Sequence, residues 1–126
     1  MRYLLDTNAL IFALTDEERL SEAVRQALRS KSNEVYFSAV NIWEIEIKVK
    51  SGKLERPVED TVAVARRTGW IELPVTSSHA VATSGFDLFH SDPFDRLLIA
   101  QAKIEGLIIV TSDRVFELYD VPLLRY

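Results

Sequence analysis

Several acidic residues in this sequence stand directly beside apolar segments. Asp6 follows the apolar stretch "RYLL", Asp113 follows "IIVTS", and Glu44 lies inside "NIWEIEI". A carboxylate in apolar surroundings is costly to bury unless it is hydrogen-bonded, paired with a base or bound to a cation. Carboxylate oxygens are also the ligands that hard divalent cations such as Mg²⁺ and Mn²⁺ prefer. Metal binding therefore has to be weighed against ordinary structural roles for these acids.

The segment "HSDPFDRLLIAQA", residues 90–102, carries two further aspartates before an apolar run. Asp92 and Pro93 suit the N-cap and the first position of a helix, where these residue types are preferred. Asp95 would stand in the first helical turn, where an acid is favourable but seldom needed. We therefore expect Asp92 to cap the helix and Asp95 to be free for another role.

Structural roles are available to the other acids as well. Asp6 could act as a helix N-cap, and Asp113 could cap a short turn over "DRVFEL". Glu44 could pair with Lys48 four residues later, an interaction worth only about 0.2–0.5 kcal/mol. Each of these roles accounts for one acid at a time, and none explains why the acids recur in similar places.

The hydrophobic pattern alternates between short strands and helices. We expect strands over residues 2–5, 34–38, 70–75, 107–112 and 121–126, the last at a sheet edge because of its proline. We expect helices over residues 8–14, 21–30, 40–50, 58–69, 77–85 and 93–106. This alternation predicts a single α/β domain over residues 1–126, with a central parallel sheet flanked by helices on both faces. The strand ends of such a sheet meet at one edge, which would gather Asp6, Glu44, Asp95 and Asp113.

Two of the expected helices carry more specific predictions. The helix over residues 40–50 is apolar on more than one side, so we expect it to be largely buried. Glu46 would face water on this helix and pair with Lys50. Ser77 or Ser78 is expected to cap the helix over residues 77–85.

The composition is that of one globular domain in a reducing compartment. The chain has 126 residues, of which 48% are hydrophobic and 10% aromatic, and it has no cysteine for disulfides or thiolate metal ligands. Its net charge of −4 argues weakly against non-specific electrostatic binding of nucleic acid. No apolar run reaches the ~18 residues of a membrane span. The N-terminus lacks the features of a signal peptide. We therefore expect a cytoplasmic protein without membrane contact.

Four segments resemble, in order and spacing, the PIN-domain ribonucleases of type II toxin–antitoxin systems, the VapC-like family: "LLDTNALIFAL", "SAVNIWEIEIKVKSGKL", "DPFDRLLIAQA" and "IIVTSD". The resemblance extends from Arg2 to about Tyr119. It implies a PIN-like domain and a Mg²⁺- or Mn²⁺-dependent endoribonuclease that hydrolyses RNA phosphodiester bonds as the toxin of such a pair. It also implies a homodimer whose two sites line one groove, and a cognate antitoxin that blocks this groove.

Carried over by position, the resemblance implies a catalytic and metal-binding quartet of Asp6, Glu44, Asp95 and Asp113. Many relatives carry Asn at the place of Asp113, so a later acid, Glu117 or Asp120, could take its role. The implied supporting residues are Asn8, Thr111 and Ser112, and Asp92 keeps its capping role next to the quartet. Candidates for contact with the RNA are Arg96, Lys48, Arg114 and His90. Arg96 could equally orient a carboxylate, and Lys48 could simply belong to a solvated helix end. His79 and His90 are otherwise expected to be surface or packing residues.

Three other classes of protein share parts of this pattern. A haloacid-dehalogenase-type phosphatase needs a second aspartate two residues after the first, where this chain has Asn8. A phosphoacceptor receiver domain needs an acidic pair at the first strand, where only Asp6 stands. The third is a PIN-like module that binds RNA or a partner without cutting, and we keep it as the alternative. The intact acid set argues against it, because mutually repelling acids serve no purpose in a pure binding module.

Overall fold

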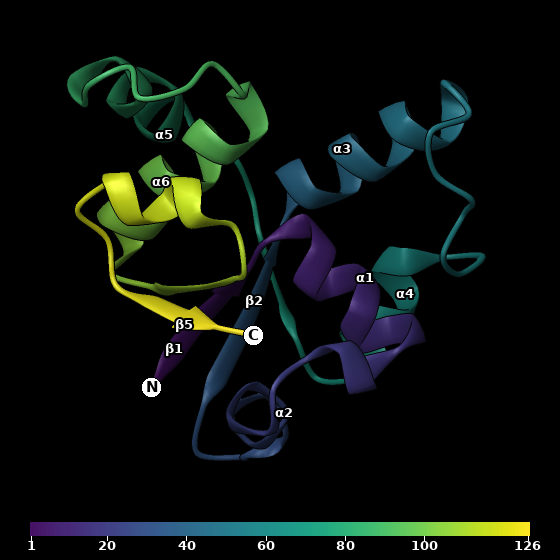
Figure 1. The fold of residues 1–126 in the computed structure, drawn as a ribbon. Coiled ribbons are helices and arrows are strands. Elements are labelled where there is room, and N and C mark those ends of the chain that lie inside the picture. The colour runs from purple at the N-terminus through teal and green to yellow at the C-terminus, as the bar shows by residue number, and fades with distance from the viewer.

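A five-stranded parallel sheet forms the centre of the molecule (Figure 1). The structure is a computed structural model that describes all residues, Met1–Tyr126. The strands are β1 (Arg2–Leu5), β2 (Glu34–Ser38), β3 (Ile71–Leu73), β4 (Ile108–Thr111) and β5 (Leu123–Arg125). They lie in the order β3-β2-β1-β4-β5, so β5 is an edge strand, as predicted. The α/β fold with a central parallel sheet is thereby confirmed.

Helices cover both faces of this sheet, as predicted. They are α1 (Thr7–Thr15), α2 (Glu22–Arg29), α3 (Ala39–Lys50), α4 (Thr61–Arg67), α5 (Ser77–Ala82) and α6 (Pro93–Glu105), with 3-10 turns η1 (Glu17–Arg19), η2 (Thr83–Gly85) and η3 (Arg114–Leu118). Figure 1 shows α5 and α6 on one side of the sheet and α1, α2 and α4 on the other. None of the helices is long and apolar enough to cross a membrane.

The core has two parts because successive side chains of a strand point to opposite faces. On β1, Leu5 packs with Leu10 of α1 and Val24 of α2, whereas Leu4 packs with Ile99 of α6 on the opposite face. All of these residues are completely buried. The central strand is thus anchored from both sides, and the residue that follows it has a fixed position.

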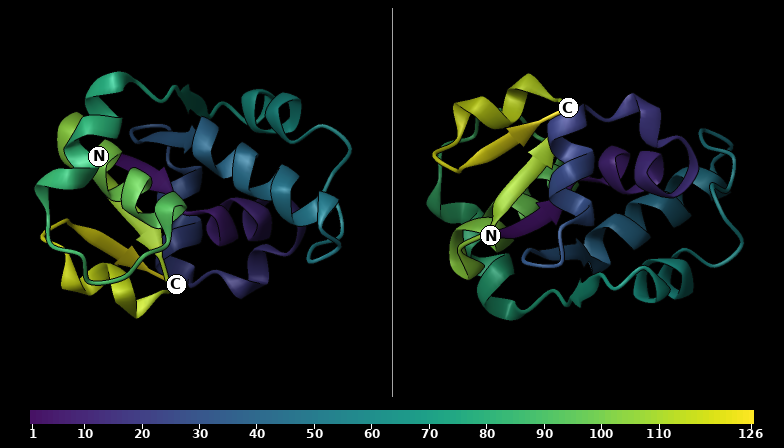
Figure 2. Two further views of the ribbon diagram at one scale, coloured as in Figure 1. Left: turned by 90° about the horizontal axis from the view of Figure 1, so that it is seen from above. Right: turned by 90° about the horizontal axis from the view of Figure 1, so that it is seen from below.

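The order of strands reverses beside β1, and this reversal creates the place where a site can form. From β1 the chain builds β2 and β3 on one side, then crosses over to build β4 and β5 on the other. Leu5 is in register with Val110, and the amide of Asp6 donates to the carbonyl oxygen of Val110 at 3.0 Å. Figure 2 shows the arrows of β1, β4 and β5 pointing towards the same end of the molecule. Ligand sites of open parallel sheets lie beyond such strand ends.

The N-cap of α5 differs from the prediction. It is Thr76, whose hydroxyl accepts from the amide of His79 at 3.3 Å, while the Thr76 amide donates to Nδ1 of His79 at 3.0 Å. His79 here takes the place that Glu or Gln holds in the usual capping box. Its imidazole is buried between α5 and α6, so it is a packing residue.

Helix α3 is less buried than predicted. Val40 and Ile45 face the core, but Trp43 is 60% exposed and Ile47 is 41% exposed. Glu46 does not pair with Lys50. Instead it accepts two hydrogen bonds from the guanidinium of Arg56, because the loop after α3 folds back and a forked guanidinium matches a carboxylate better than an ammonium does.

Candidate metal centre

A small polar cavity opens beyond the carboxyl ends of β1 and β4. Its volume is about 130 Å³. It is lined by Asp6, Thr7, Asn8, Glu44, Lys48, Asp92, Asp95, Ser112, Asp113 and Phe116. These residues come from the loops after β1 and β4, from the helices α1, α3 and α6, from the N-cap position before α6 and from the turn η3. Figure 1 shows α1 and α3 starting next to each other above the ends of β1 and β2. All members of the predicted acidic quartet line this cavity.

Asp6 is buried to the same degree as Glu44 and has two structural bonds. Its Oδ1 atom accepts from the amide of Ala9 at 2.7 Å, so it caps α1, and from the hydroxyl of Tyr126 at 3.2 Å. Burial raises the pKa of Asp6 to about 6, and the nearby Glu44 carboxylate adds to this rise. Capping and metal binding are compatible here, because the cap uses only one carboxylate oxygen.

Glu44 is buried on α3 and is held by two neighbours. Its Oε1 atom accepts from the hydroxyl of Thr7 at 2.5 Å, and Thr7 in turn accepts from the side-chain amide of Asn41 at 3.1 Å. Its Oε2 atom lies 2.7 Å from Nζ of Lys48. The predicted pair with Lys48 therefore exists, but it lies inside the acidic cavity rather than on a solvated helix face.

Asp92 and Asp95 have separate structural roles. Oδ1 of Asp92 accepts from the amides of Phe94 and Asp95 at 2.9 and 3.2 Å, so Asp92 is the N-cap of α6, as predicted. The carboxylate of Asp95 stands one turn further, and its Oδ2 atom lies 3.2 Å from Nε2 of His90. Burial raises the pKa of Asp95 to about 6, and the negative charges of Asp92 and Glu44 contribute to this rise.

The fourth acid of the cavity is Asp113. It is exposed, and its Oδ1 atom accepts from the amide of Val115 at 3.0 Å while its own amide donates to Thr111 Oγ1 at 3.1 Å. Of the two later acids, Glu117 pairs with Arg125, and Asp120 lies next to a different hollow of the surface. Among the three candidates, Asp113 is the one that lines the cavity.

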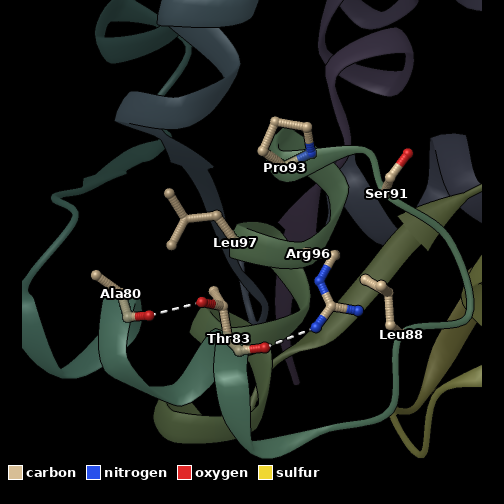
Figure 3. A pocket seen from close by; sticks show the side chains of 7 residues that line it. All are labelled: Ala80, Thr83, Leu88, Ser91, Pro93, Arg96 and Leu97. Carbon is tan, nitrogen blue, oxygen red and sulfur yellow. Dashed lines mark hydrogen bonds between the residues drawn. The ribbon is translucent and has the colours of Figure 1, made fainter.

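The basic residues expected at the substrate behave differently from one another. Lys48 lines the cavity, and Arg114 is exposed beside Asp113. Arg96 does not contact an acid. Its guanidinium donates to the carbonyl oxygens of Thr83, Asp87 and Phe86 and lines a separate pocket, where Figure 3 shows it directed at the Thr83 carbonyl. These donors of Arg96 are engaged within the protein, and its contact with RNA stays a prediction.

The donor set of the cavity suits a hydrated divalent cation. Several carboxylates surround one small space, and two of them have a raised pKa because burial and like charges disfavour their ionised forms. A cation at this place would relieve both effects. No three acidic or histidine side chains are grouped closely enough to ligate one ion at the same time. This fits Mg²⁺, which keeps several waters and uses only one or two carboxylates directly.

Three residues of the site were missed at the sequence level. Thr7 and Asn41 orient Glu44, and Tyr126 reaches Asp6 from the far end of the chain. Thr7 could have been found, because it directly follows a candidate ligand and faces the same strand end. Neither Asn41 nor Tyr126 carries such a signal, since their contacts depend on how α1, α3 and the C-terminus pack.

Known structures share this arrangement of strands and helices over nearly the whole chain. VapBC2 from Rickettsia felis, bound to a DNA fragment from its promoter, is 17% identical, with a TM-score of 0.78 over 100% of this chain and 99% of that one. DNA-bound VapBC from Salmonella typhimurium is 22% identical, with a TM-score of 0.73 over 99% and 98%. FitAcB from Neisseria gonorrhoeae is 22% identical, with a TM-score of 0.65 over 97% and 96%. No curated protein sequence matches the chain.

The fold and the cavity define a parallel α/β domain with a carboxylate site at its strand ends. The family model of the PIN domain matches residues 3–122, which is almost the entire chain. The chain therefore belongs to the PIN domain family.

Proposed function

We propose that this PIN domain is a metal-dependent endoribonuclease that hydrolyses RNA phosphodiester bonds. The observation that carries the proposal is the gathering of Asp6, Glu44, Asp95 and Asp113 around one cavity at the ends of the central strands. Carboxylates that repel one another destabilise the folded protein, and a bound divalent cation would compensate their charges. RNA brings its own negative phosphate to such a cation, so the acidity of the site does not exclude a nucleic acid substrate.

Each acid of the cavity would have a defined task. Asp6 and Asp95 would hold Mg²⁺ or Mn²⁺ directly or through water, and Glu44 and Asp113 would complete its surroundings. When bound, the cation supplies positive charge for the phosphate and lowers the pKa of water enough for attack at neutral pH. Thr7 keeps Glu44 directed into the cavity, and the Ala9 amide keeps Asp6 in place. Lys48, with its ammonium at the cavity wall, would contact a phosphate oxygen once Glu44 is engaged elsewhere.

We further propose that the protein is the toxin of a type II toxin–antitoxin pair and acts as a homodimer in the cytoplasm. Support comes from its fold neighbours, which include VapBC from Rickettsia felis and from Salmonella typhimurium, and a member of the VapBC family of toxin–antitoxin systems from Mycobacterium tuberculosis. Exposed apolar side chains such as Trp43, Ile47, Val81 and Leu88 offer surface for a protein partner.

A cleavage assay with the purified protein tests the enzymatic proposal. RNA should be cut in the presence of Mg²⁺ or Mn²⁺, and cleavage should stop with EDTA or in Asp6→Asn. The matched control is Asp120→Asn, an exposed acid away from the cavity, which should cut like the wild type. Cleavage that persists both with EDTA and in Asp6→Asn would contradict a metal mechanism.

The alternative is a PIN domain that binds RNA or a protein partner without cutting. The observation that favours it is the ion pair of Lys48 with Glu44, which gives the acidic cavity a positive charge without any metal. Clear Mn²⁺ and RNA binding without any cleavage would support this alternative.

A further inference from the structure

His90 connects a candidate metal ligand to the packed interior of the domain. It lies in the loop before α6, and its side chain is 19% exposed. Its Nε2 atom is 3.2 Å from Oδ2 of Asp95, and its Nδ1 atom is 2.7 Å from the hydroxyl oxygen of Tyr119. The same hydroxyl oxygen accepts from Nη1 of Arg96 at 3.1 Å. These contacts form a continuous chain, Arg96–Tyr119–His90–Asp95, which we call the His90 relay.

The hydrogen atoms of the His90 relay can be arranged in one consistent way. An ionised Asp95 can only accept, so Nε2 of His90 carries the hydrogen and donates it. Nδ1 of the neutral ring is then an acceptor for the Tyr119 hydroxyl, whose oxygen accepts from the always-charged Arg96. The opposite tautomer would place a lone pair against the carboxylate and leave the Tyr119 hydrogen without an acceptor.

The far end of the relay is firmly anchored. Arg96 donates to the carbonyl oxygens of Thr83 and Phe86 and lies over the Phe86 ring at 4.7 Å from its centre. Tyr119 is 4% exposed and packs edge to face against Phe86 and Phe89. The His90 relay is thus anchored at η2 and the loop that follows it, and this anchoring fixes the position of His90 beside the cavity. Arg96 faces away from the acids but holds the Tyr119 hydroxyl in place.

The Asp95 carboxylate has one direct partner, His90. Contact with His90 is the single hydrogen bond that its carboxylate makes within the protein. The nearest charged neighbours in the cavity include Asp92 and Glu44, which repel it. A carboxylate in this position would turn towards solvent unless a donor held it, so the partner of Oδ2 decides where Oδ1 points.

We propose that His90 is the positioning residue for Asp95, using Nε2–H to fix Oδ2 so that Oδ1 faces the cation. This inference rests on the proposed function, because it assumes that Asp95 helps to hold the metal. Neighbours that orient metal ligands in this way typically contribute about 10–100-fold to metal affinity. His90 would act through Asp95 and would not itself touch the phosphate.

A pair of substitutions separates this role from packing. In His90→Gln the amide nitrogen lies where Nε2 was and can still donate to Asp95. In His90→Asn it reaches only the position of Nδ1. We expect His90→Asn to weaken Mn²⁺ binding about tenfold or more, and His90→Gln to stay within about threefold of the wild type. Mn²⁺ affinity is read from the electron paramagnetic resonance signal of free Mn²⁺, and the melting temperature without metal is recorded for each variant.

Tyr119→Phe provides a second test that does not alter His90. It removes the hydroxyl that accepts from Arg96 and holds Nδ1, but keeps the ring, so Mn²⁺ binding should weaken by a few fold. Combined with His90→Asn it should add nothing further, because both changes break the same chain of contacts. Full additivity of the two changes would overturn the relay.

The outcomes distinguish the inference from the function beneath it. Wild-type protein that binds Mn²⁺, with His90→Asn binding equally well, would overturn the positioning role alone. Equal losses in His90→Asn and His90→Gln, with equal loss of melting temperature, would also overturn it, because the ring would then matter only for packing. Wild-type protein that fails to bind Mn²⁺, or binds it no better than Asp95→Asn, would overturn the proposed metal site itself.

Discussion

The ammonium of Lys48 lies 2.7 Å from Oε2 of Glu44, inside the cavity that also contains Asp92 and Asp95. The bond to Glu44 raises the pKa of Lys48, and the charges of Asp92 and Asp95 raise it further. Among the residues that line the cavity, Lys48 is the single lysine or arginine. Lys48 therefore partly neutralises the acids in the metal-free protein, as a divalent cation would in the metal-bound protein.

Replacing Lys48 by methionine should separate these two roles. Lys48→Met keeps the aliphatic chain but removes the charge, so the metal-free protein should melt about 3–6 °C lower because its acids repel one another uncompensated. Mn²⁺ should bind several-fold more tightly, since it no longer competes with an ammonium. Calorimetric melting curves with and without Mn²⁺ measure both effects. The matched control is Lys50→Met, on the exposed side of the same helix, which should change neither quantity.

Thr7 is expected to be important for both stability and activity. Thr7→Val keeps the shape but removes the hydroxyl that donates to Glu44 and accepts from Asn41. Two buried polar groups would lose a partner, which costs about 1–3 kcal/mol for each group in the free energy of unfolding. Cleavage should fall as well, because Glu44 is no longer oriented. Urea unfolding and RNA cleavage measure the two effects.

Thr15→Val is the matched control for this change, since Thr15 is exposed at the end of the same helix. It should cost less than about 0.5 kcal/mol and leave cleavage unchanged. Similar behaviour of the two variants would show that Thr7 has no special part in the site.

The strand ends explain why much of the site could be predicted. Asp6 and Asp113 follow short apolar runs that indicate buried strands, and parallel strands end at one edge of a sheet. Asp95 follows a Pro in the first turn of a helix, a pattern that fixes its place on the helix start. The regular backbone geometry of strands and helices is therefore enough to predict where these acids lie, without knowledge of tertiary packing.

Side-chain directions and partners between distant segments could not be predicted in this way. Arg96 stands next to Asp95 in the chain, yet a helix turns neighbouring side chains about 100° apart, and Arg96 points at the Thr83 carbonyl instead. Trp43 belongs to an apolar helix but stays 60% exposed, although its ring packs edge to face against Phe94 of α6. Tyr126 contacts Asp6 across the full length of the chain.

Metal affinity should depend on pH through Asp6 and Asp95. Both have a pKa of about 6 in the folded protein, against about 3.9 in an unfolded chain. A cation must displace their protons, so apparent Mn²⁺ affinity should rise steeply up to about pH 6 and level off above it. Titrations with Mn²⁺ between about pH 5 and 8 measure this. An affinity that is constant below about pH 6 would show that neither acid holds the metal.

The same pKa shifts set the stability of the metal-free protein. Between about pH 4 and 6 the folded state binds more protons than the unfolded state, so the free energy of unfolding should fall as pH rises through this range. Above it, the cost of ionising Asp6 and Asp95 is fully present. Saturating Mn²⁺ should reverse the trend, because the bound ion compensates both carboxylates. Urea unfolding curves at several pH values, with and without Mn²⁺, test the sign directly.

The two aspartates at the start of α6 should respond to substitution in opposite ways. Asp92→Ala removes the oxygen that accepts from the amides of Phe94 and Asp95, and loss of an N-cap costs about 0.5–2 kcal/mol in the free energy of unfolding. Asp95→Asn instead removes a half-buried, repelled charge, so the metal-free protein should be as stable as the wild type or slightly more stable. Its Mn²⁺ binding and RNA cleavage should be lost, whereas Asp92→Ala should retain cleavage at temperatures where it is folded.

Asp92→Asn is the matched control, because asparagine caps a helix about as well as aspartate. Urea unfolding together with cleavage assays on the three variants would show the split, and a stable Asp95→Asn that still cuts RNA would remove Asp95 from the site.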